Sequence, residues 1–180
     1  LKHYEKLALG VIFSEEILKE LKIDCSLNAD VISEDFGSVG IITGSQTGIP
    51  QFVHASFAEY FVALYFSKHF EMIPADTFFD QKYNNVRFFF DMIIGKNSPA
   101  HIAVLYRNFN ELRNHGDEII KCKDESGRSA LHLICSWGRR YPRSNVKEQD
   151  DFYIIDDNFA SVPEETKEYY NALLFLLDKC

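Results

Sequence analysis

Apolar residues recur at helical spacing at the start of the chain. Leu7, Ala8, Val11 and Ile12 fall on one face of a helix over residues 2–12, because steps of three and four residues return to the same side of a helix. The pattern therefore predicts a helix that buries this face.

Two more helices and a hairpin are predicted after it. Ser14 suits the N-cap of a helix that has acidic residues in its first turn. A short helix is expected within residues 28–37. Residues 40–43 and 51–54 are predicted to be strands, and the glycines and proline of segment 44–50 predict a loop or wing between them. The residues that the helix after Ser14 is expected to bury are Ile17, Leu18 and Leu21.

The residues after His54 predict a strong helix that is apolar almost all round. A helix of this kind is buried, so it is expected to be a central element. One stripe of this helix holds Phe57, Phe61, Leu64 and Tyr65, and the residues that widen the stripe are Ala58, Val62 and Phe66.

Two further helices are predicted in the middle of the chain. Residues 85–94 form an aromatic helix that Gly95 ends at the C′ position. Ser98 as N-cap and Pro99 at the first helical position begin the next helix, which Gly116 ends. The residues expected on one face of this single helix are Ile102, Leu105, Phe109 and Leu112.

Composition and charge narrow the class of protein. The chain is 46% hydrophobic and 26% charged, which is typical of a soluble globular protein, and its 16 Phe and nine Tyr predict an interior filled by aromatic rings. No apolar run approaches the roughly 18 residues of a membrane span. The net charge of −8, with no Lys or Arg between Lys22 and Lys68, argues against nucleic acid as a partner. A DNA-binding winged helix is rejected because the candidate recognition helix, residues 28–37, is acidic.

The cysteines predict neither a metal site nor a secreted protein. Cys25, Cys122, Cys135 and Cys180 include no C-x2-C pair, and Cys122, His132 and Cys135 match no usual ligand spacing. Free thiols in a reducing cytoplasm are the expectation, with no metal bound.

One segment carries a family resemblance. Residues 51–66, QFVHASFAEYFVALYF, resemble the end of the winged-helix domain in NACHT-type signalling ATPases, the NOD-like receptors and their relatives, whose pattern is roughly F-x-H-x-[ST]-F-x-E-[YF]-x-x-A. The resemblance implies that His54 contacts the phosphates of ADP and holds the parent protein shut. An imidazole N–H can donate to a phosphate oxygen, and titration near neutrality permits a charge-assisted bond. The matching positions are Phe52, His54, Ser56, Phe57, Glu59, Tyr60 and Ala63.

The chain is not expected to be an enzyme by itself. It lacks the phosphate-cradling G-x-x-x-x-G-K-[ST] pattern and the nucleophile spacing G-x-S-x-G. Residues 44–48 have glycines without a lysine, which favours a hairpin loop. A buried acid–base carboxylate is one interpretation of Glu59, but it is expected instead to pair with a neighbouring backbone or basic group and to orient its helix. No cofactor is expected in the chain itself. The parent protein is expected to bind ADP or ATP.

A second resemblance lies in residues 124–138, DESGRSALHLICSWG. They are similar to the turn and first helix of an ankyrin repeat, D-x-x-G-x-T-P-L-H-x-A-x-x-x-G. Asp and Gly make a tight turn, the Ser129 hydroxyl is expected to cap the helix, and Leu131 to point into the stack. The resemblance implies that His132 ties the turn to the helix by hydrogen bonds. The matching positions are Asp124, Gly127, Leu131, His132 and Gly138, with Ser129 in place of Thr and Ala130 in place of Pro.

The repeat period predicts a long insertion. Helix ends at Gly116 and Cys180 are interpreted as equivalent and lie 64 residues apart, whereas an ankyrin repeat has about 33 residues. The extra residues are placed at about 139–165, a segment that begins basic and becomes acidic. An exposed loop is expected, and two roles stay open for it, partner binding or none.

The predicted fold class is therefore mainly α. The expected parts are a winged-helix-like end of a NACHT module (1–70), a helical linker with the tail of a preceding repeat (71–116), and an ankyrin-like repeat with its insertion (117–180). The chain is expected to be a fragment of a cytoplasmic signalling protein, suspected to sense immune or stress signals, whose repeats bind a protein ligand and relay that event to an NTPase module. The alternative is a plain ankyrin-repeat adaptor whose N-terminal helices cap the stack.

Overall fold

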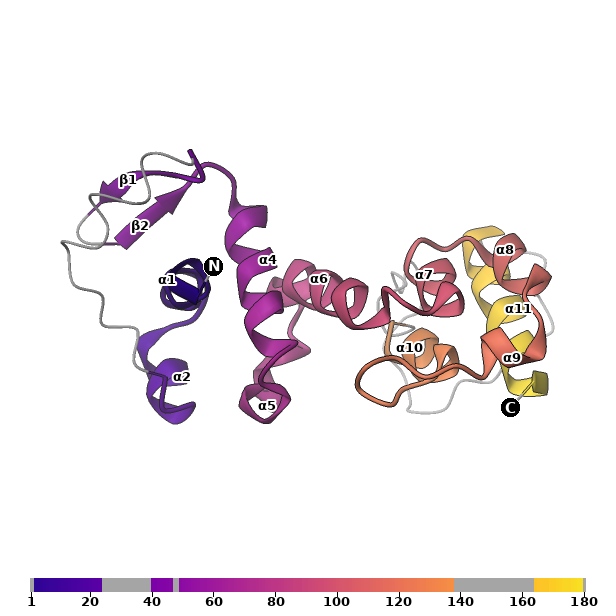
Figure 1. Ribbon diagram of the computed structural model, residues 1–180. Coiled ribbons are helices and arrows are strands. Elements are labelled where there is room, and N and C mark those ends of the chain that lie inside the picture. Colours follow the sequence, from indigo (N-terminus) through magenta and orange to yellow (C-terminus); the bar gives the residue numbers. More distant parts are fainter. Residues whose placement is uncertain (1, 24–39, 47–48, 138–163, 180) are drawn as a thin grey trace, which may run out of the picture. The chain divides into compact units, whose positions relative to one another are not determined.

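The computed structural model describes residues 2–23, 40–46, 49–137 and 164–179 (Figure 1). The chain divides into two compact units, which we call unit 1 (Leu1–Ile93) and unit 2 (Ile94–Cys180). The fold is mainly α with one small β-hairpin, as predicted. The helix expected within residues 28–37, Gly138 and nearly all of the expected insertion lie outside the described residues.

Unit 1 contains the helices predicted at 2–12, after Ser14 and after His54, and most of the helix predicted at 85–94. That last helix crosses the division between the units. In chain order the elements are α1 (Lys2–Ile12), α2 (Glu15–Glu20), β1 (Ile42–Gln46), β2 (Ile49–Phe52), α4 (Ala55–Phe66), η1 (Phe70–Met72), α5 (Ala75–Phe78), η2 (Gln81–Tyr83) and α6 (Asn84–Gly95).

The buried face of α1 differs from the predicted one. Val11 is 37% exposed, whereas Leu9 is fully buried beside Leu7 and Ala8. The same face also buries Glu5, whose carboxylate accepts a hydrogen bond from the Lys68 ammonium just after α4. This ion pair lets a charged residue occupy a buried helix position, which periodicity of apolar residues does not reveal. In α2 only Leu18 of the three expected residues is buried, and the Ser14 side chain makes no cap hydrogen bond.

The hairpin extends further towards its turn than predicted. Its antiparallel strands pair Ile42 with Phe52 and continue to Gln46 opposite Ile49, so most of the predicted loop belongs to the strands. Pro50 is compatible with this pairing because both strands of a two-stranded sheet are edge strands. Strand β2 ends at Phe52, so His54 lies beyond the strand and not inside it.

Aromatic rings fill the interior of unit 1, as the composition predicted. Phe66 at the end of α4 is fully buried and meets Phe13 edge-on at 5.8 Å and Phe78 at 5.9 Å between ring centroids. Phe13 also contacts Tyr83 at 4.9 Å, and Phe78 contacts Phe90 at 5.5 Å. Four helical segments are therefore joined through neighbouring rings.

Only part of α4 is buried. The buried residues of the helix are Ala58, Phe61, Val62, Ala63 and Phe66, whereas Phe57, expected in the central stripe, is 41% exposed. The apolar circumference of α4 therefore includes one face that unit 1 does not cover.

The described part of unit 2 is helical, and one predicted helix is in fact two helices. A single helix from Pro99 to Gly116 is wrong because Arg107 adopts a φ of 55°, which ends one helix and turns the chain into the next. The elements are α7 (Pro99–Leu105), α8 (Phe109–Asn114), α9 (Asp117–Ile120), α10 (Ala130–Trp137) and α11 (Glu164–Lys179).

The break also changes which residues α7 buries. Its buried apolar residues are Ala100, Ala103 and Val104, whereas Ile102 and Leu105 are only half-buried. Ser98 is the N-cap and Pro99 the first residue, as predicted. Gly95 does not end α6 in the left-handed conformation; a Cβ there would lie 3.1 Å from the Cβ of His101, so its small size is what α7 requires.

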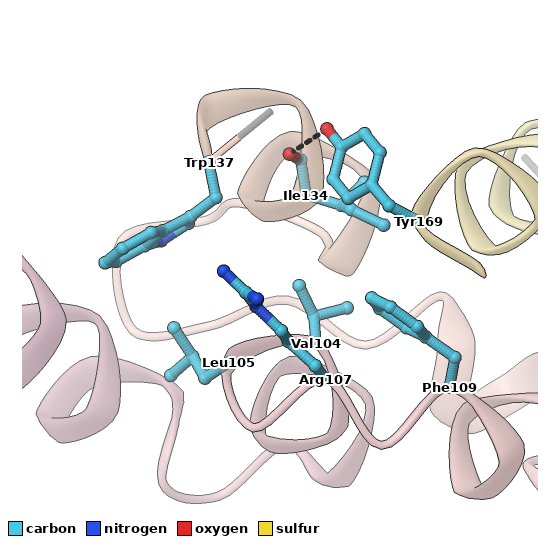
Figure 2. Close-up of a pocket in the computed structure, with 7 residues that line it drawn as sticks. All are labelled: Val104, Leu105, Arg107, Phe109, Ile134, Trp137 and Tyr169. Atoms are coloured by element: carbon cyan, nitrogen blue, oxygen red, sulfur yellow. Dashed lines mark hydrogen bonds between the residues drawn. The ribbon is translucent and has the colours of Figure 1, made fainter. Parts of the chain in front are cut away.

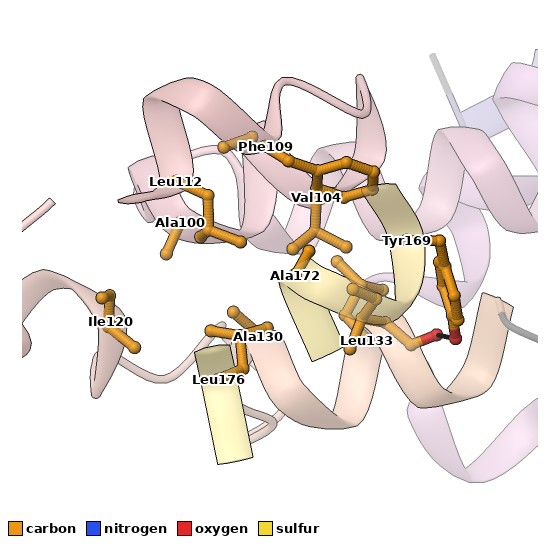
Figure 3. Close-up of a cluster of buried hydrophobic side chains, with 12 residues drawn as sticks. Ala100, Val104, Phe109, Leu112, Ile120, Ala130, Leu133, Tyr169, Ala172 and Leu176 are labelled. Carbon is orange, nitrogen blue, oxygen red and sulfur yellow. Dashed lines mark hydrogen bonds between the residues drawn. The ribbon is translucent and has the colours of Figure 1, made fainter. Parts of the chain in front are cut away.

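The core of unit 2 lies between the two helix pairs α7–α8 and α10–α11 (Figure 3). Leu112 of α8, Leu133 of α10 and Leu176 of α11 are all fully buried there. The hydroxyl of Tyr169 donates to the carbonyl oxygen of Ile134 at 2.7 Å, so the ring can be buried with its polar atom satisfied.

We expect Phe66→Ala to destabilise unit 1 by about 3–5 kcal/mol, because a fully buried ring that joins several helices leaves a cavity. Phe57→Ala removes the same ring from an exposed position of the same helix and is expected to cost about 0.5 kcal/mol or less. Urea unfolding followed by far-ultraviolet circular dichroism measures both. Equal losses in the two variants would contradict the assignment of Phe66 to the core.

Candidate functional site

His54 lies at the corner between the hairpin and α4, where it is exposed to solvent. Its backbone is extended (φ −142°, ψ 140°), and its side chain is the N-cap of α4: Nδ1 accepts a hydrogen bond from the Ser56 backbone N–H at 3.1 Å. The cap satisfies one of the N–H groups that a helix start leaves without an intrahelical partner.

This cap determines which hydrogen the imidazole can offer. Because Nδ1 of His54 accepts a hydrogen bond, the proton of the neutral ring lies on Nε2. Protonation of Nδ1 would remove the acceptor and break the cap. The geometry therefore leaves Nε2–H as the hydrogen that the capping ring can donate to a ligand. The positive end of the α4 dipole lies at the same corner and favours an anion there.

The other residues of the F-x-H motif divide between core and surface. Phe52 is half-buried and packs near Phe61, with 6.3 Å between ring centroids. Among the described residues, the partner of Glu59 is neither a backbone group nor a basic residue: both of its carboxylate oxygens accept from the Asn85 amide, at 3.0 and 3.2 Å. This interaction ties α4 to α6. Val53 and Phe57, 53% and 41% exposed, flank His54.

The predicted turn at residues 124–128 is built around one carboxylate. Oδ1 of Asp124 accepts from the Ser126 and Arg128 backbone N–H groups, both at 2.9 Å, and Oδ2 accepts from the Arg128 side chain at 2.9 Å. Gly127 has a φ of +81°, which favours glycine, and its N–H donates to the Asp124 carbonyl.

His132 bonds the residue that begins its helix. Nδ1 of His132 lies 2.7 Å from the Ser129 hydroxyl and 3.3 Å from the Ser129 backbone N–H, which makes Nδ1 the acceptor of both. The Ser129 hydroxyl therefore donates its hydrogen to the imidazole of His132. Leu131 is half-buried against the core, whereas Leu133 and Ile134 are fully buried.

A matching network at His101 was not predicted. This imidazole is fully buried; its Nδ1 lies 2.7 Å from the Ser98 hydroxyl and its Nε2 lies 3.0 Å from the Arg128 carbonyl oxygen. A carbonyl only accepts, so Nε2 carries the proton and the Ser98 hydroxyl donates to Nδ1.

The two histidine networks share one residue pattern. Ser98-x-x-His101 and Ser129-x-x-His132 lie 31 residues apart, and each begins the first helix of a pair. Aligning Ser98-Pro99 with the later serine would have shown this in the sequence. The bond that could not be foreseen is the one from His101 to the turn of the second pair, because it joins residues of different helix pairs.

The pKa of Asp124 is lowered by its turn. Burial raises the pKa of this carboxyl, but the hydrogen bonds from Ser126 and Arg128 and the Arg128 charge outweigh burial and keep it below its ordinary value of 3.8. Nε2 of His101 lies 3.9 Å from Oδ2 of Asp124, so the same carboxylate also faces the buried imidazole.

A small pocket lies near the end of α10 (Figure 2). Its volume of about 30 Å³ admits roughly one water molecule. The residues that line it are Val104, Leu105, Arg107, Phe109, Ile134, Trp137 and Tyr169.

The described residues include neither a metal-ligand group nor a membrane-spanning helix. Cys122 and Cys135 are exposed and free, and no group of His, Cys, Asp or Glu there has the arrangement of a metal site. No helix in this part of the chain is both long and apolar enough to cross a membrane. Comparison with known proteins found no matching family, curated protein or solved structure.

We expect Asp124→Asn to destabilise unit 2 at neutral pH and by less as the pH falls. A carboxylate whose pKa is lowered by folding stabilises the native state above its ordinary value of 3.8, and this contribution is lost as the pH falls through the lower native value. Urea unfolding at pH 7, 5 and 3, followed by fluorescence of the single tryptophan, Trp137, measures the difference.

Glu168→Gln at an exposed position of α11 is the control, expected to change the free energy of unfolding by about 0.5 kcal/mol or less at neutral pH. A destabilisation by Asp124→Asn that stays constant from pH 7 to pH 3 would show that the carboxylate charge does not matter.

Proposed function

We propose that the chain is a non-catalytic part of a nucleotide-switched signalling protein of the NACHT type. In this proposal His54 contacts the phosphates of ADP held by an NTPase module elsewhere in the parent protein. Unit 2 supplies ankyrin-like helix pairs that bind a protein ligand, and ligand binding changes the nucleotide state. The parent is a cytoplasmic protein that uses ADP and ATP.

The observation that carries the proposal is the orientation of the His54 imidazole. Its Nδ1 is engaged by the Ser56 N–H, so its Nε2–H is the donor at an exposed corner beside the N-terminus of a 12-residue helix. A donor and a helix dipole at one corner suit a phosphate oxygen. When ADP and its phosphate leave, the Nε2–H of His54 loses its partner. The ADP-bound state and the state without this contact therefore differ in free energy.

Two features of unit 2 support the ankyrin-like part of the proposal. The Ser-x-x-His network occurs twice at a spacing of 31 residues, close to the ankyrin period of about 33. In the first pair the imidazole also bonds the carbonyl of the next turn, whereas His132 is exposed and its Nε2 is available for an equivalent bond. The pattern suits an array in which each pair is tied to its successor.

A second candidate function rests on unit 2 alone. The repeated histidine network is independent of any nucleotide, and it is equally compatible with a plain adaptor that binds proteins through ankyrin-like repeats. The two candidates differ in whether a P-loop is encoded upstream of Leu1 in the same transcript.

The test of the nucleotide contact is ADP affinity of the longer protein carrying His54→Asn. Asparagine can still cap α4, but it has no donor at the position of Nε2. We expect the affinity for ADP to fall about tenfold, because a hydrogen bond to a charged group usually contributes about that factor to binding. Isothermal titration with ADP measures it.

His54→Ala removes both the cap and the donor, so it should lose the same affinity and also about 1 kcal/mol of stability. His3→Asn, at an exposed position of α1, should leave ADP binding unchanged. Undiminished ADP binding by His54→Asn would refute the phosphate contact.

A further inference from the structure

Helix α11 carries apolar residues on two opposite faces. One face, with Tyr169, Ala172 and Leu176, is buried in the core of unit 2 (Figure 3). The opposite face exposes Tyr170 (40%), Leu174 (62%) and Leu177 (53%), which we call the outer stripe. Spacings of four and three residues put these side chains on one side of the helix.

Comparison within the chain shows that the helix pair does not require apolar residues at the positions of Leu174 and Leu177. Leu112 of α8 and Leu176 of α11 are both fully buried and lie 64 residues apart, the separation already inferred between equivalent helix ends. At that offset, Leu174 and Leu177 correspond to Asn110 and Arg113, which are exposed polar residues. The same position in the same kind of helix is thus polar in the first pair and apolar in the second.

Exposed large apolar residues in one row indicate an interaction surface when packing does not explain them. Three adjacent apolar side chains at helical spacing match the face that another amphipathic helix presents. The size and shape of the stripe therefore point to a helical partner.

The charge of α11 narrows the class of partner helix that fits the outer stripe. Its residues include four carboxylates and two lysines. Both lysines already have acidic partners: Lys167 lies 3.6 Å from Glu164 and Lys179 lies 2.9 Å from Asp117. Asp178 is an exposed carboxylate four residues after Leu174 and therefore lies beside the outer stripe, whereas Glu168 is exposed on another side of the helix.

We propose that the outer stripe of α11 binds a basic amphipathic helix of a partner protein. The apolar row of the partner covers Tyr170, Leu174 and Leu177, and its flanking Lys or Arg residues lie near the carboxylates of α11. A second copy of this chain would bring the same acidic helix against itself, and its net charge of −8 opposes that pairing. An anionic membrane surface is opposed for the same reason. This surface is distinct from the His54 corner and does not depend on the nucleotide switch.

The probe for the test is a fluorescein-labelled basic amphipathic helix, LKKLLKLLKKLLKL, added to the full chain. Its counterpart LEELLELLEELLEL has the same apolar row and the opposite charge. We expect saturable binding of the basic peptide in fluorescence anisotropy and at least about tenfold weaker binding of the acidic one.

The decisive variant is Leu174→Gln/Leu177→Gln, which removes two of the three apolar residues of the row and leaves every charge in place. Binding of the basic peptide is expected to fall about tenfold or more. Asn110→Gln/Asn114→Gln, at exposed positions of α8, is the matched control and should bind like the original chain. If circular dichroism shows that the double variant has lost helix, Leu174→Gln alone is used, with a smaller loss expected.

Three results would overturn the proposal. Undiminished binding by the leucine variants would mean that the peptide responds only to negative charge. A concentration-dependent dimer in light scattering that the leucine variants abolish would assign the stripe to a second copy. Binding to phosphatidylglycerol vesicles that needs Leu174 and Leu177 would assign it to a membrane surface.

Discussion

Burial of one face of α4 is the interaction on which unit 1 depends. The helix begins at the candidate site and ends in the core, so the packing of Phe61 and Phe66 positions the His54 corner. The Tyr4 ring stacks on Phe61 at 5.2 Å, and Lys68 reaches back to the buried Glu5 carboxylate. Both interactions hold α1 against α4. A rigid helix behind an exposed histidine is what allows a single donor to be aimed at a ligand.

In unit 2 the corresponding constraint is a buried imidazole that must satisfy both of its nitrogens. His101 does so with the Ser98 hydroxyl on one side and the Arg128 carbonyl on the other. Leaving either nitrogen without a partner in the core would cost about 1–3 kcal/mol. The first helix pair is therefore tied to the turn of the second by a requirement for hydrogen bonding, and the aliphatic core between the pairs adds non-directional attraction.

Much of the helical content could be predicted because periodicity and caps are local signals. The start of α7 at Ser98-Pro99 and the helix that follows His54 are examples. The break at Arg107 could not be predicted, because a non-glycine residue at φ 55° has no strong local signature. The partner of Glu59 was also not predicted: the Asn85 amide that bonds its carboxylate lies 26 residues further along the chain.

The sequence by itself determined the fold class, the starts of α2, α4 and α7, the aromatic interior and the turn at Asp124, since each depends on residues close together in the chain. Only the tertiary structure decided which apolar faces are buried. Phe57 and Phe61 are equally apolar in the sequence, yet one is exposed and the other buried. Leu174 and Leu176 differ in the same way. The reason is physical: burial depends on what packs against a helix, and a helix that is apolar on two faces does not specify which of them its own chain will cover.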